Sequence, residues 1–481
     1  MPEFVLGLDV GTTSAQAMVV DLTGQVLGRA KTRLETQHTL PGRAEQDPRA
    51  VWEVVQSILS AALSDAGCGA ADLATMGVTT QRSSVVIWDR KTAEPLTPLI
   101  LWMDLRGLER AATLLERGFI AAPHAAVAKL EAALREVPNG QARAQAGELA
   151  WGTLDSFLIY RLTGGAVHTT DYSNAWSTCY LDLGTLRGWN EALLDFQGLP
   201  LSLFPDLCDT YGELGATASS VIGAEVPIGA LVADQQSGMF AHHAFSAGDW
   251  KATYGTSATL MMSTGPVPDF TSKLTPMLQY GKGDESLFAC EGMVVSAGTL
   301  IDWLVRDLGL FGSVEDLLAA AAAAGGSDGV AIVPALQGLG APHNDSTRRA
   351  SIVGLSGAST RSEIAFAALE SIAFRIREIA QSAGETEGIT LGEDLPVDGG
   401  LTASDLMLQI QADILGRPVT RHVEPEATTL GACVAAALGA GLVTKEGSAE
   451  LARVARRFEP RQDVGEADAR FEHWRSLTGM P

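Results

Sequence analysis

The chain has 481 residues, of which 46% are hydrophobic and 19% are charged, and this predicts a globular protein with more than one core. Its net charge of −23 argues against nucleic acid as a partner, because a polyphosphate backbone requires a basic surface. The longest apolar run, residues 430–443, is short and rich in alanine and glycine, so it predicts a buried helix and no membrane span.

The cysteines and the N-terminus indicate a cytoplasmic location. The five cysteines are scattered without a CxxC pair, which predicts reduced thiols and argues against a disulfide framework or a zinc site. Met1-Pro2-Glu3 leads directly into an apolar run, so we expect no signal peptide.

In the first half of the chain, the apolar run 4–8 ends at Asp9 and is followed by a Gly-Thr turn and a second strand, the pattern of a hairpin. Asp47-Pro48 predicts the start of a helix, with an N-cap residue and proline in the first turn. We expect strands on both sides of Gln81-Arg82. Residues 106–150 are expected to be mostly helical and residues 154–162 to form a further helix.

Near the midpoint of the chain an apolar run ends at Asp234, and after it a strand-like run over residues 250–256 carries another Gly-Thr turn. A strand at 395–397 lies between helices predicted at 362–380 and 403–415. Strands alternate with helices in both halves, which predicts an α/β fold. Because the pattern restarts after residue 245, we expect two related domains, 1–245 and 246–481.

Three glycine turns, each after a predicted strand, are candidates for nucleotide binding. In the first, Gly11 lets backbone N–H groups approach an anion, the hydroxyls of Thr12, Thr13 and Ser14 add donors, and Asp9 could hold Mg²⁺ through water. The second is Gly255-Thr256, and the third, Asp398-Gly399-Gly400, opens a helix and could lie against an adenosine. A plain hairpin turn or strand-to-helix loop remains the alternative for each turn taken singly.

Asp234 is the candidate general base. At the end of an apolar run, a carboxylate can accept the proton of an alcohol that attacks phosphorus, while Asp9 serves the metal. An N-cap role fits Asp234 equally well. Arg82 could bind substrate hydroxyls or be a surface arginine, and Trp102 could stack on a carbon chain or belong to the core. His242 and His243 are adjacent on an expected helix and cannot face one ligand.

Several segments together resemble the FGGY family of carbohydrate kinases and, within it, the glycerol kinases most. They include DVGTTSAQAMVVD, GVTTQRSSVVIWD, ADQQSGMF, TYGTSATL and DGGLTASDLMLQIQADILGRPV, and the likeness runs from about residue 4 to about residue 445. The resemblance implies two actin-like, ribonuclease H-like domains that close on ATP·Mg²⁺ and a sugar or polyol, and a homo-oligomer, either a dimer or a tetramer.

The resemblance also implies residue roles. Asp234 matches the catalytic base and Asp9 the metal-associated aspartate. The matching nucleotide-side positions are Thr12, Thr13, Ser14, Gly255, Thr256, Gly298, Gly400, Leu401 and Ser404, and the matching substrate-side positions are Arg82, Ser83, Trp102, His124, Asp234, Gln235 and Thr259.

The departures from the glycerol kinase pattern gather in the substrate pocket. Ser83 replaces a glutamate, His124 a tyrosine and Thr259 a phenylalanine, which implies a wider pocket and a longer polyol or sugar than glycerol. A ketose such as xylulose or a C4–C5 polyol is the alternative acceptor. An alternative of another class is a non-catalytic nucleotide-binding regulator on the same fold, motivated by the broken first family signature around His124 and opposed by the intact Asp9 and Asp234.

Overall fold

The computed structural model of the protein describes residues 4–461 and 463–480, so the N-terminal residues on which the absence of a signal peptide was argued lie outside it. The chain divides into two compact units. Unit 1 contains the chain up to His243 together with Leu278–Ser286 and Thr428–Leu451, and unit 2 contains Ala244–Met277, Leu287–Ala427 and the chain from Ala452 onward.

The elements of the chain up to His243 all belong to unit 1. They are β1 (Phe4–Val10), β2 (Ser14–Val20), β3 (Val26–Arg33), β4 (Glu45–Gln46), α1 (Pro48–Ala66), η1 (Ala70–Asp72), β5 (Leu73–Thr80), β6 (Val86–Asp89), β7 (Leu99–Ile100), α2 (Leu108–Glu116), η2 (Ala126–Ala128), α3 (Leu130–Glu136), α4 (Gly140–Gln145), β8 (Leu149–Gly152), α5 (Leu154–Leu162), β9 (Thr169–Asp171), α6 (Tyr172–Ser177), α7 (Glu191–Gln197), η3 (Leu201–Leu203), β10 (Asp206–Cys208), α8 (Ser219–Ile222), β11 (Ile228–Ala233) and α9 (Asp234–Ala241).

The later elements begin with the strands of a second sheet. They are β12 (Trp250–Tyr254), β13 (Ala258–Gly265), β14 (Thr275–Lys282), β15 (Glu285–Val294), α10 (Gly298–Asp302), η4 (Trp303–Asp307), α11 (Val314–Ala324), β16 (Ala331–Val333), β17 (Ser351–Val353), α12 (Arg361–Gly384), β18 (Leu395–Asp398), η5 (Gly400–Ala403), α13 (Asp405–Leu415), β19 (Val419–His422), α14 (Ala427–Gly439), η6 (Gly447–Glu450), β20 (Val454–Phe458) and α15 (Val464–Thr478).

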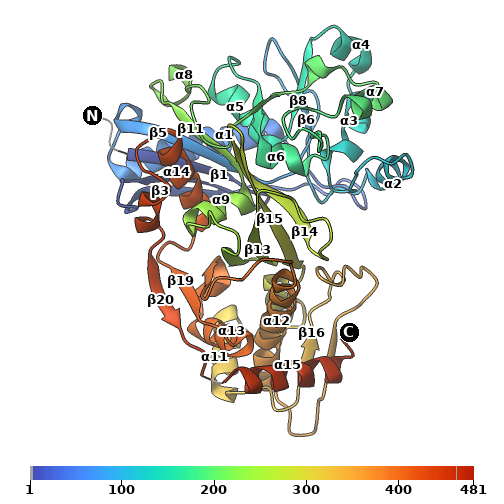
Figure 1. Ribbon diagram of the computed structural model, residues 1–481, viewed down its shortest axis with the longest axis vertical. Helices are drawn as coiled ribbons and strands as arrows, with labels where there is room; N and C mark the ends of the chain where they lie inside the picture. The colour runs from blue at the N-terminus through green and yellow to red at the C-terminus, as the bar shows by residue number, and fades with distance from the viewer. Residues whose placement is uncertain (1–3, 462, 481) are drawn as a thin grey trace. The chain divides into compact units, whose positions relative to one another are not determined.

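The main sheet of unit 1 has the strand order β11-β5-β1-β2-β3 (Figure 1). β1 and β2 form the predicted antiparallel hairpin, with Asp9 opposite Gln16. β5 pairs in parallel with both β1 and β11. The carboxyl ends of these three strands therefore meet at one edge of the sheet, where a parallel sheet places its binding residues.

Helix α14 packs unusually closely on this sheet, because glycines face it from three strands. A Cβ atom at Gly77 of β5 would lie 2.1 Å from the Ala432 carbonyl oxygen. A Cβ atom at Gly7 of β1 would lie 2.6 Å from the Thr429 carbonyl oxygen. A Cβ atom at Gly229 of β11 would lie 2.6 Å from the Ala436 carbonyl oxygen. Figure 1 shows α14 beside β5 and β11. The apolar run at 430–443 thus lies, up to Gly439, in a helix packed against a sheet.

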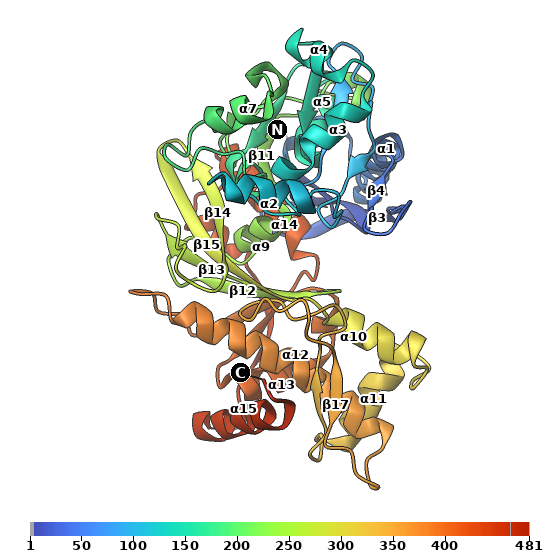
Figure 2. The same ribbon diagram turned by 90° about the vertical axis from the view of Figure 1, so that its right-hand side faces the viewer.

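The sheet that forms most of unit 2 has the order β14-β15-β13-β12-β18-β19-β20. Helices α12, α13 and α15 lie together on one side of β12 and β13 (Figure 2). α12 begins with a capping box formed by Thr360 and Glu363. Phe374 of α12 stacks on Trp474 of α15 with ring centroids 5.0 Å apart, so α15 closes the apolar core of the unit.

The element predictions hold best where a local signal was strong. α1 begins at Pro48 with Asp47 as its N-cap, and α5 spans the expected residues. The helical stretch expected over 106–150 is instead divided into α2, η2, α3 and α4 with turns between them. Pro123 and Pro138 lie in these interruptions, where proline disfavours a continuous helix.

The compact units differ from a single division at residue 245. Leu278–Ser286 and Thr428–Leu451, both expected in the second domain, group with unit 1. For α14 the reason is the close packing on the glycine-lined face of the first sheet. Over residues 4–461 and 463–480, no helix combines the length and the apolar character needed to cross a membrane.

Candidate active site

Three predicted residues come together at the carboxyl edge of the unit 1 sheet. Asp9 lies near the end of β1, Arg82 follows β5, and Asp234 directly follows β11 as the first residue of α9. Arg82 Nε lies 3.6 Å from Asp234 Oδ1. The parallel register, with Ala233 opposite Thr80 and Asp9 opposite Thr79, explains why residues so distant in sequence meet.

Two hydrogen bonds hold Asp234 in place, one at its side chain and one at the preceding residue. Its Oδ1 accepts a hydrogen bond of 2.7 Å from the Gln235 N–H, and the preceding Ala233 N–H donates to Ser173 Oγ at 2.9 Å. Ala233, not Asp234, occupies the N-cap position of α9. The Asp234 side chain is 26% exposed, so its carboxylate is accessible to small molecules.

A buried carboxylate supports Ser173 in turn. Asp171 accepts hydrogen bonds from the backbone N–H groups of Ser173 and Asn174 and from the Thr210 hydroxyl. Burial raises the pKa of Asp171, while these hydrogen bonds lower it. Asp171 thus caps α6, the helix that holds the N–H next to Asp234.

The first glycine turn, Gly11 to Ser14, is fixed by three side chains from elsewhere in unit 1. Gln46 Nε2 donates to the Thr12 carbonyl at 2.7 Å, and the Thr12 hydroxyl donates to Gln81 Oε1 at 3.1 Å. The Trp102 indole N–H donates to Thr12 Oγ1 at 3.1 Å. Gln46 and Gln81 were not predicted as site residues, because hydrogen bonds between segments so distant in the chain leave no local signal. Thr13 is exposed at the tip of the turn.

The remaining acceptor-side candidates differ in how accessible they are. Trp102 is 37% exposed, and because its N–H is already bonded it offers a ring face rather than a donor. Ser83 is 4% exposed and its hydroxyl donates to the Ser177 carbonyl, so it has only acceptor capacity left for a ligand. His124 is exposed, and Gln235 is half-buried next to Asp234.

In unit 2, the second glycine turn packs on the start of α10. The Gly298 N–H donates to the Gly255 carbonyl at 3.1 Å, and the Thr299 N–H donates to the Thr256 carbonyl at 3.0 Å. A Cβ atom at Gly298 would lie 2.5 Å from the Gly255 oxygen, so this contact requires glycine. Gly255, Thr256 and Gly298, predicted on the nucleotide side from separate segments, are therefore adjacent.

The third glycine turn lies beside the second because β12 and β18 pair in parallel, with Thr253 opposite Asp398. Gly399 has φ of 94°, and a Cβ atom there would lie 2.6 Å from the Tyr254 carbonyl oxygen. Nothing lies within 4 Å of a Cβ atom at Gly400, so its backbone faces open space. All the glycines predicted to hold nucleotide in unit 2 thus gather at one site.

The three other unit 2 candidates have distinct environments. Ser404 is the N-cap of α13, and its Oγ accepts from the Met407 N–H at 3.2 Å. Leu401 is half-buried in the turn between Gly400 and Ser404. Thr259, a predicted substrate residue, lies in β13 opposite Thr253 and Met293 and is only 5% exposed.

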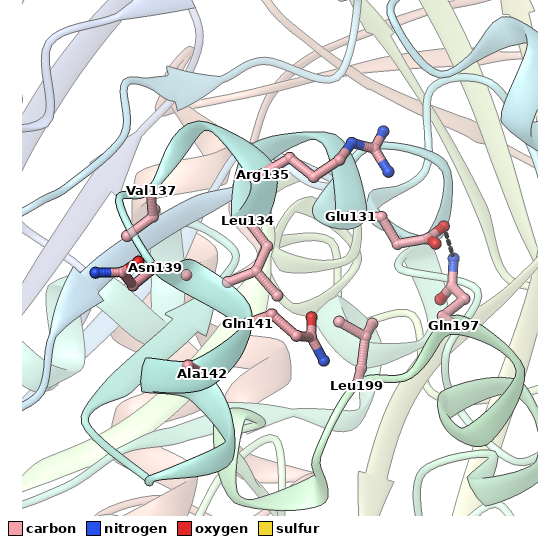
Figure 3. A pocket seen from close by; sticks show the side chains of 10 residues that line it. Glu131, Leu134, Arg135, Val137, Asn139, Gln141, Ala142, Gln197 and Leu199 are labelled. Carbon is pink, nitrogen blue, oxygen red and sulfur yellow. Dashed lines mark hydrogen bonds between the residues drawn. The ribbon is translucent and has the colours of Figure 1, made fainter.

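A pocket of about 580 Å³ lies elsewhere in unit 1, and none of the predicted site residues lines it (Figure 3). Helices α3 and α4 and residues Gln197 and Leu199 form its wall. Its carboxylate, Glu131, accepts from the Gln197 amide at 2.8 Å and pairs with Arg110.

In the part of the chain that the structure describes, no group of three or more His, Cys, Asp and Glu side chains could hold a metal ion. His242 caps the end of α9 and His243 follows it in the left-handed region, with φ of 54°.

The chain matches known proteins over nearly its full length. Residues 4–241 match the N-terminal domain, and residues 250–440 the C-terminal domain, of the FGGY family of carbohydrate kinases. It is 39% identical to a glycerol kinase of Aromatoleum aromaticum, over 98% of this chain and 97% of that protein. It is 37% identical to a glycerol kinase of Thermus brockianus, with the same coverage of 98% and 97%.

Solved structures agree with these matches. The structure of Plasmodium falciparum glycerol kinase with ADP aligns with a TM-score of 0.90 and 26% identity over 99% of this chain and 97% of that one. A xylulose kinase of Lactobacillus acidophilus, with a TM-score of 0.83 and 22% identity over 99% and 97% of the two chains, shares the fold. The fold is the two-domain, actin-like α/β fold of sugar kinases. The chain belongs to the FGGY family of carbohydrate kinases, phosphotransferases that act on an alcohol group.

Proposed function

We propose that this kinase transfers the γ-phosphoryl group of ATP to a terminal hydroxyl of a glycerol-like polyol, with Asp234 as the general base. The observation that carries the proposal is the placement of Asp234. It is a partly exposed carboxylate at the start of α9, 3.6 Å from Arg82, at the sheet edge that also bears Asp9.

This geometry supports the following roles on the acceptor side of the reaction. The substrate hydroxyl donates a hydrogen bond to Asp234 and loses its proton to it as the oxygen attacks phosphorus. Arg82, next to that carboxylate, binds a neighbouring hydroxyl and so fixes which oxygen is presented. The exposed ring face of Trp102 contacts the carbon chain, and His124 and Gln235 complete the set of polar groups.

The nucleotide side is assigned to the three glycine turns. The open backbone at Gly400 suits the close approach of an adenosine, while Gly255 and Thr256 present backbone N–H and hydroxyl groups to phosphate. Thr12, Thr13 and Ser14 of the first turn do the same in unit 1. In unit 2, Gly298, Leu401 and Ser404 are the further residues assigned to the nucleotide.

Asp9 fits a magnesium ion that arrives with the nucleotide. Mg²⁺ usually keeps several waters and takes one or two carboxylates plus substrate phosphates, so a single aspartate suffices. The Thr429 hydroxyl lies 3.5 Å from Asp9 Oδ2 and helps to orient the carboxylate. When bound, the ion neutralises charge that develops on the transferred phosphoryl group.

Glycerol is the first acceptor to test, because relatives at 36–39% identity are named glycerol kinases. A C4–C5 polyol or a ketose such as xylulose is the second candidate, because Ser83, His124 and Thr259 depart from the glycerol kinase pattern. The homo-oligomer and the cytoplasmic location stay predictions from the sequence.

A coupled ADP-release assay over C3 to C6 polyols, ketoses and sugar acids tests this proposal. We expect phosphorylation of glycerol or a slightly longer polyol, dependent on Mg²⁺. A rate with glycerol at least equal to that with every other compound would refute the view that Ser83, His124 and Thr259 shift the substrate preference toward a longer polyol or sugar. The absence of phosphorylation across the whole panel would refute the proposed function.

A further inference from the structure

A lysine ammonium group is completely buried beside the acceptor side of the site. Lys129 lies between η2 and α3 and is 0% exposed. Its Nζ donates hydrogen bonds to the carbonyl oxygens of Ser83 at 2.9 Å, Leu101 at 2.9 Å and His124 at 2.8 Å. A protonated lysine has three N–H groups, so each one is matched to a carbonyl.

Each of these carbonyls belongs to a segment that carries a proposed substrate-binding residue. Ser83 directly follows Arg82, Leu101 directly precedes Trp102, and His124 is itself a candidate. These segments are separated by tens of residues in sequence, and the described contacts join them at one nitrogen atom. A displacement of Lys129 Nζ would therefore weaken hydrogen bonds to all three segments at once.

The backbone conformation of Ser83 is one that the hydrogen bond from Lys129 can stabilise. Ser83 has φ of 62°, a left-handed conformation that is uncommon for a residue other than glycine. This conformation persists only where surrounding contacts hold it. The bonds from Lys129 Nζ to the Ser83 carbonyl and from Ser83 Oγ to Ser177 supply such contacts, and Arg82 takes its direction from the same backbone.

Among the residues that the structure describes, no ion pair of Lys129 explains its burial. Asp104, which acts on it electrostatically, is bonded to Arg106, and Arg106 also pairs with Glu45. The favourable effect of Asp104 is thus opposed by Arg106. The direct partners of the ammonium are the backbone carbonyls, which points to a role in holding the backbone.

We propose that Lys129 is a positioning residue for the acceptor pocket, whose ammonium group holds the segments of Arg82, Trp102 and His124 in the arrangement that binds the polyol. The proposal rests on the proposed function, since it takes these residues to be the substrate-binding ones. It assigns Lys129 no contact with substrate or nucleotide.

Protonation of Lys129 gives the pocket a pH dependence. Burial lowers the pKa of Lys129 to about 7, although hydrogen bonds from the ammonium to carbonyls favour the charged form. The neutral amine has only two N–H groups, so above that pH one carbonyl loses its donor. The KM for the polyol should therefore rise between about pH 6 and pH 8. Asp104, Arg106 and the imidazole of His124 are the other charged or titratable groups to consider.

Kinetics of a graded series test the proposal. Lys129→Met removes every donor, Lys129→Gln keeps two N–H groups without charge, and exposed Lys91→Met is the matched control. We expect the KM for the polyol to rise about tenfold or more in Lys129→Met and less in Lys129→Gln. The KM for ATP should change by less than about twofold, and Lys91→Met should behave as the wild type. Equal changes in both KM values, or none, would overturn the proposal.

The pH profile gives a readout that a merely structural role would not change. The rise of the polyol KM between about pH 6 and pH 8 should vanish in Lys129→Gln, which cannot titrate in that range. If it persists there, the titrating group is another one, such as His124, and the assignment to Lys129 is wrong.

Hydrogen exchange separates this proposal from the proposed function. In Lys129→Met, amide exchange should accelerate at residues 82–84, 101–103 and 123–126 and stay unchanged in the second glycine turn of unit 2. Uniform acceleration, or none, would overturn the proposal even if the wild-type enzyme phosphorylates a polyol. A wild type without activity on any alcohol would instead refute the proposed function. The exchange pattern would still test whether Lys129 holds the three segments together.

Discussion

At the scale of single residues, Trp102 connects the acceptor side of the site to the first glycine turn. Trp102→Phe keeps an aromatic face but removes the indole N–H that donates to Thr12 Oγ1. Loss of one such hydrogen bond costs about 1 kcal/mol, so kcat/KM should fall roughly fivefold to tenfold. Steady-state kinetics with both substrates varied would check this. A Trp102→Leu variant should lose more, because it also lacks the ring. Equal losses in the two variants would show that the indole N–H, and not the ring, accounts for the effect.

The candidate site residues that could be predicted from the sequence lie inside recognisable local patterns. Asp9, Asp234 and the Gly-Thr turns each follow an apolar strand, and parallel pairing brings strand ends together. Gln46, Gln81 and Lys129 could not be found in this way, because each acts through hydrogen bonds to a segment far away in the chain. The left-handed backbone of Ser83 and the bond that its hydroxyl donates also depend on such tertiary contacts.

At the scale of elements, the seating of α14 on the first sheet depends on glycine. Gly77→Ala would place a Cβ atom 2.1 Å from the Ala432 carbonyl oxygen, which forces the helix or the strand to move. We expect a loss of about 1–3 kcal/mol in the free energy of unfolding, measured by urea denaturation. Gly188→Ala is the control, since no heavy atom lies within 4 Å of its Cβ position. Similar stability of the two variants would contradict the packing described for α14.

His168 should make the contacts of β8 and β9 sensitive to acid. Its Nε2–H donates to the Trp151 carbonyl at 2.9 Å, and burial lowers the pKa of His168 to about 4. Between pH 6.5 and 4 the unfolded chain binds a proton that the folded chain does not bind. The free energy of unfolding should therefore decrease by on the order of 2–3 kcal/mol as the pH is lowered from 6.5 to 4.

His168→Gln, which keeps an amide N–H for the same carbonyl, should lack this part of the pH dependence. Burial raises the pKa of Asp155, a neighbouring buried carboxylate, to about 6. Asp155 titrates in both proteins, so the difference between their unfolding curves isolates His168. An identical pH dependence of the two would argue against a neutral, buried imidazole.

The boundaries of the elements show where local signals end. α1 and α5 were predicted well because a cap or a regular apolar spacing marks them. The 106–150 stretch was predicted too continuous, because alanine-rich segments have high helix propensity even where prolines interrupt them. The grouping of α14 with unit 1 depends on contacts with Gly7, Gly77 and Gly229, which no local pattern reveals.

At the scale of the whole molecule, the residues proposed for the reaction are divided between two units. Unit 1 bears the carboxylates Asp9 and Asp234 with Arg82 and the first glycine turn, and unit 2 bears the second and third glycine turns. The restart of the pattern after residue 245 predicted two domains. It could not predict that segments around residues 280 and 440 return to unit 1.

The role of Asp234 as general base is the central claim, and the turnover of Asp234→Asn tests it most directly. Asparagine keeps the shape of the side chain and an oxygen that can accept from the Gln235 N–H, but it cannot take up the substrate proton. We predict that kcat falls by about two to four orders of magnitude, while the thermal unfolding midpoint and the affinity for ATP stay close to those of the wild type. Turnover near the wild-type rate in this variant would contradict the account.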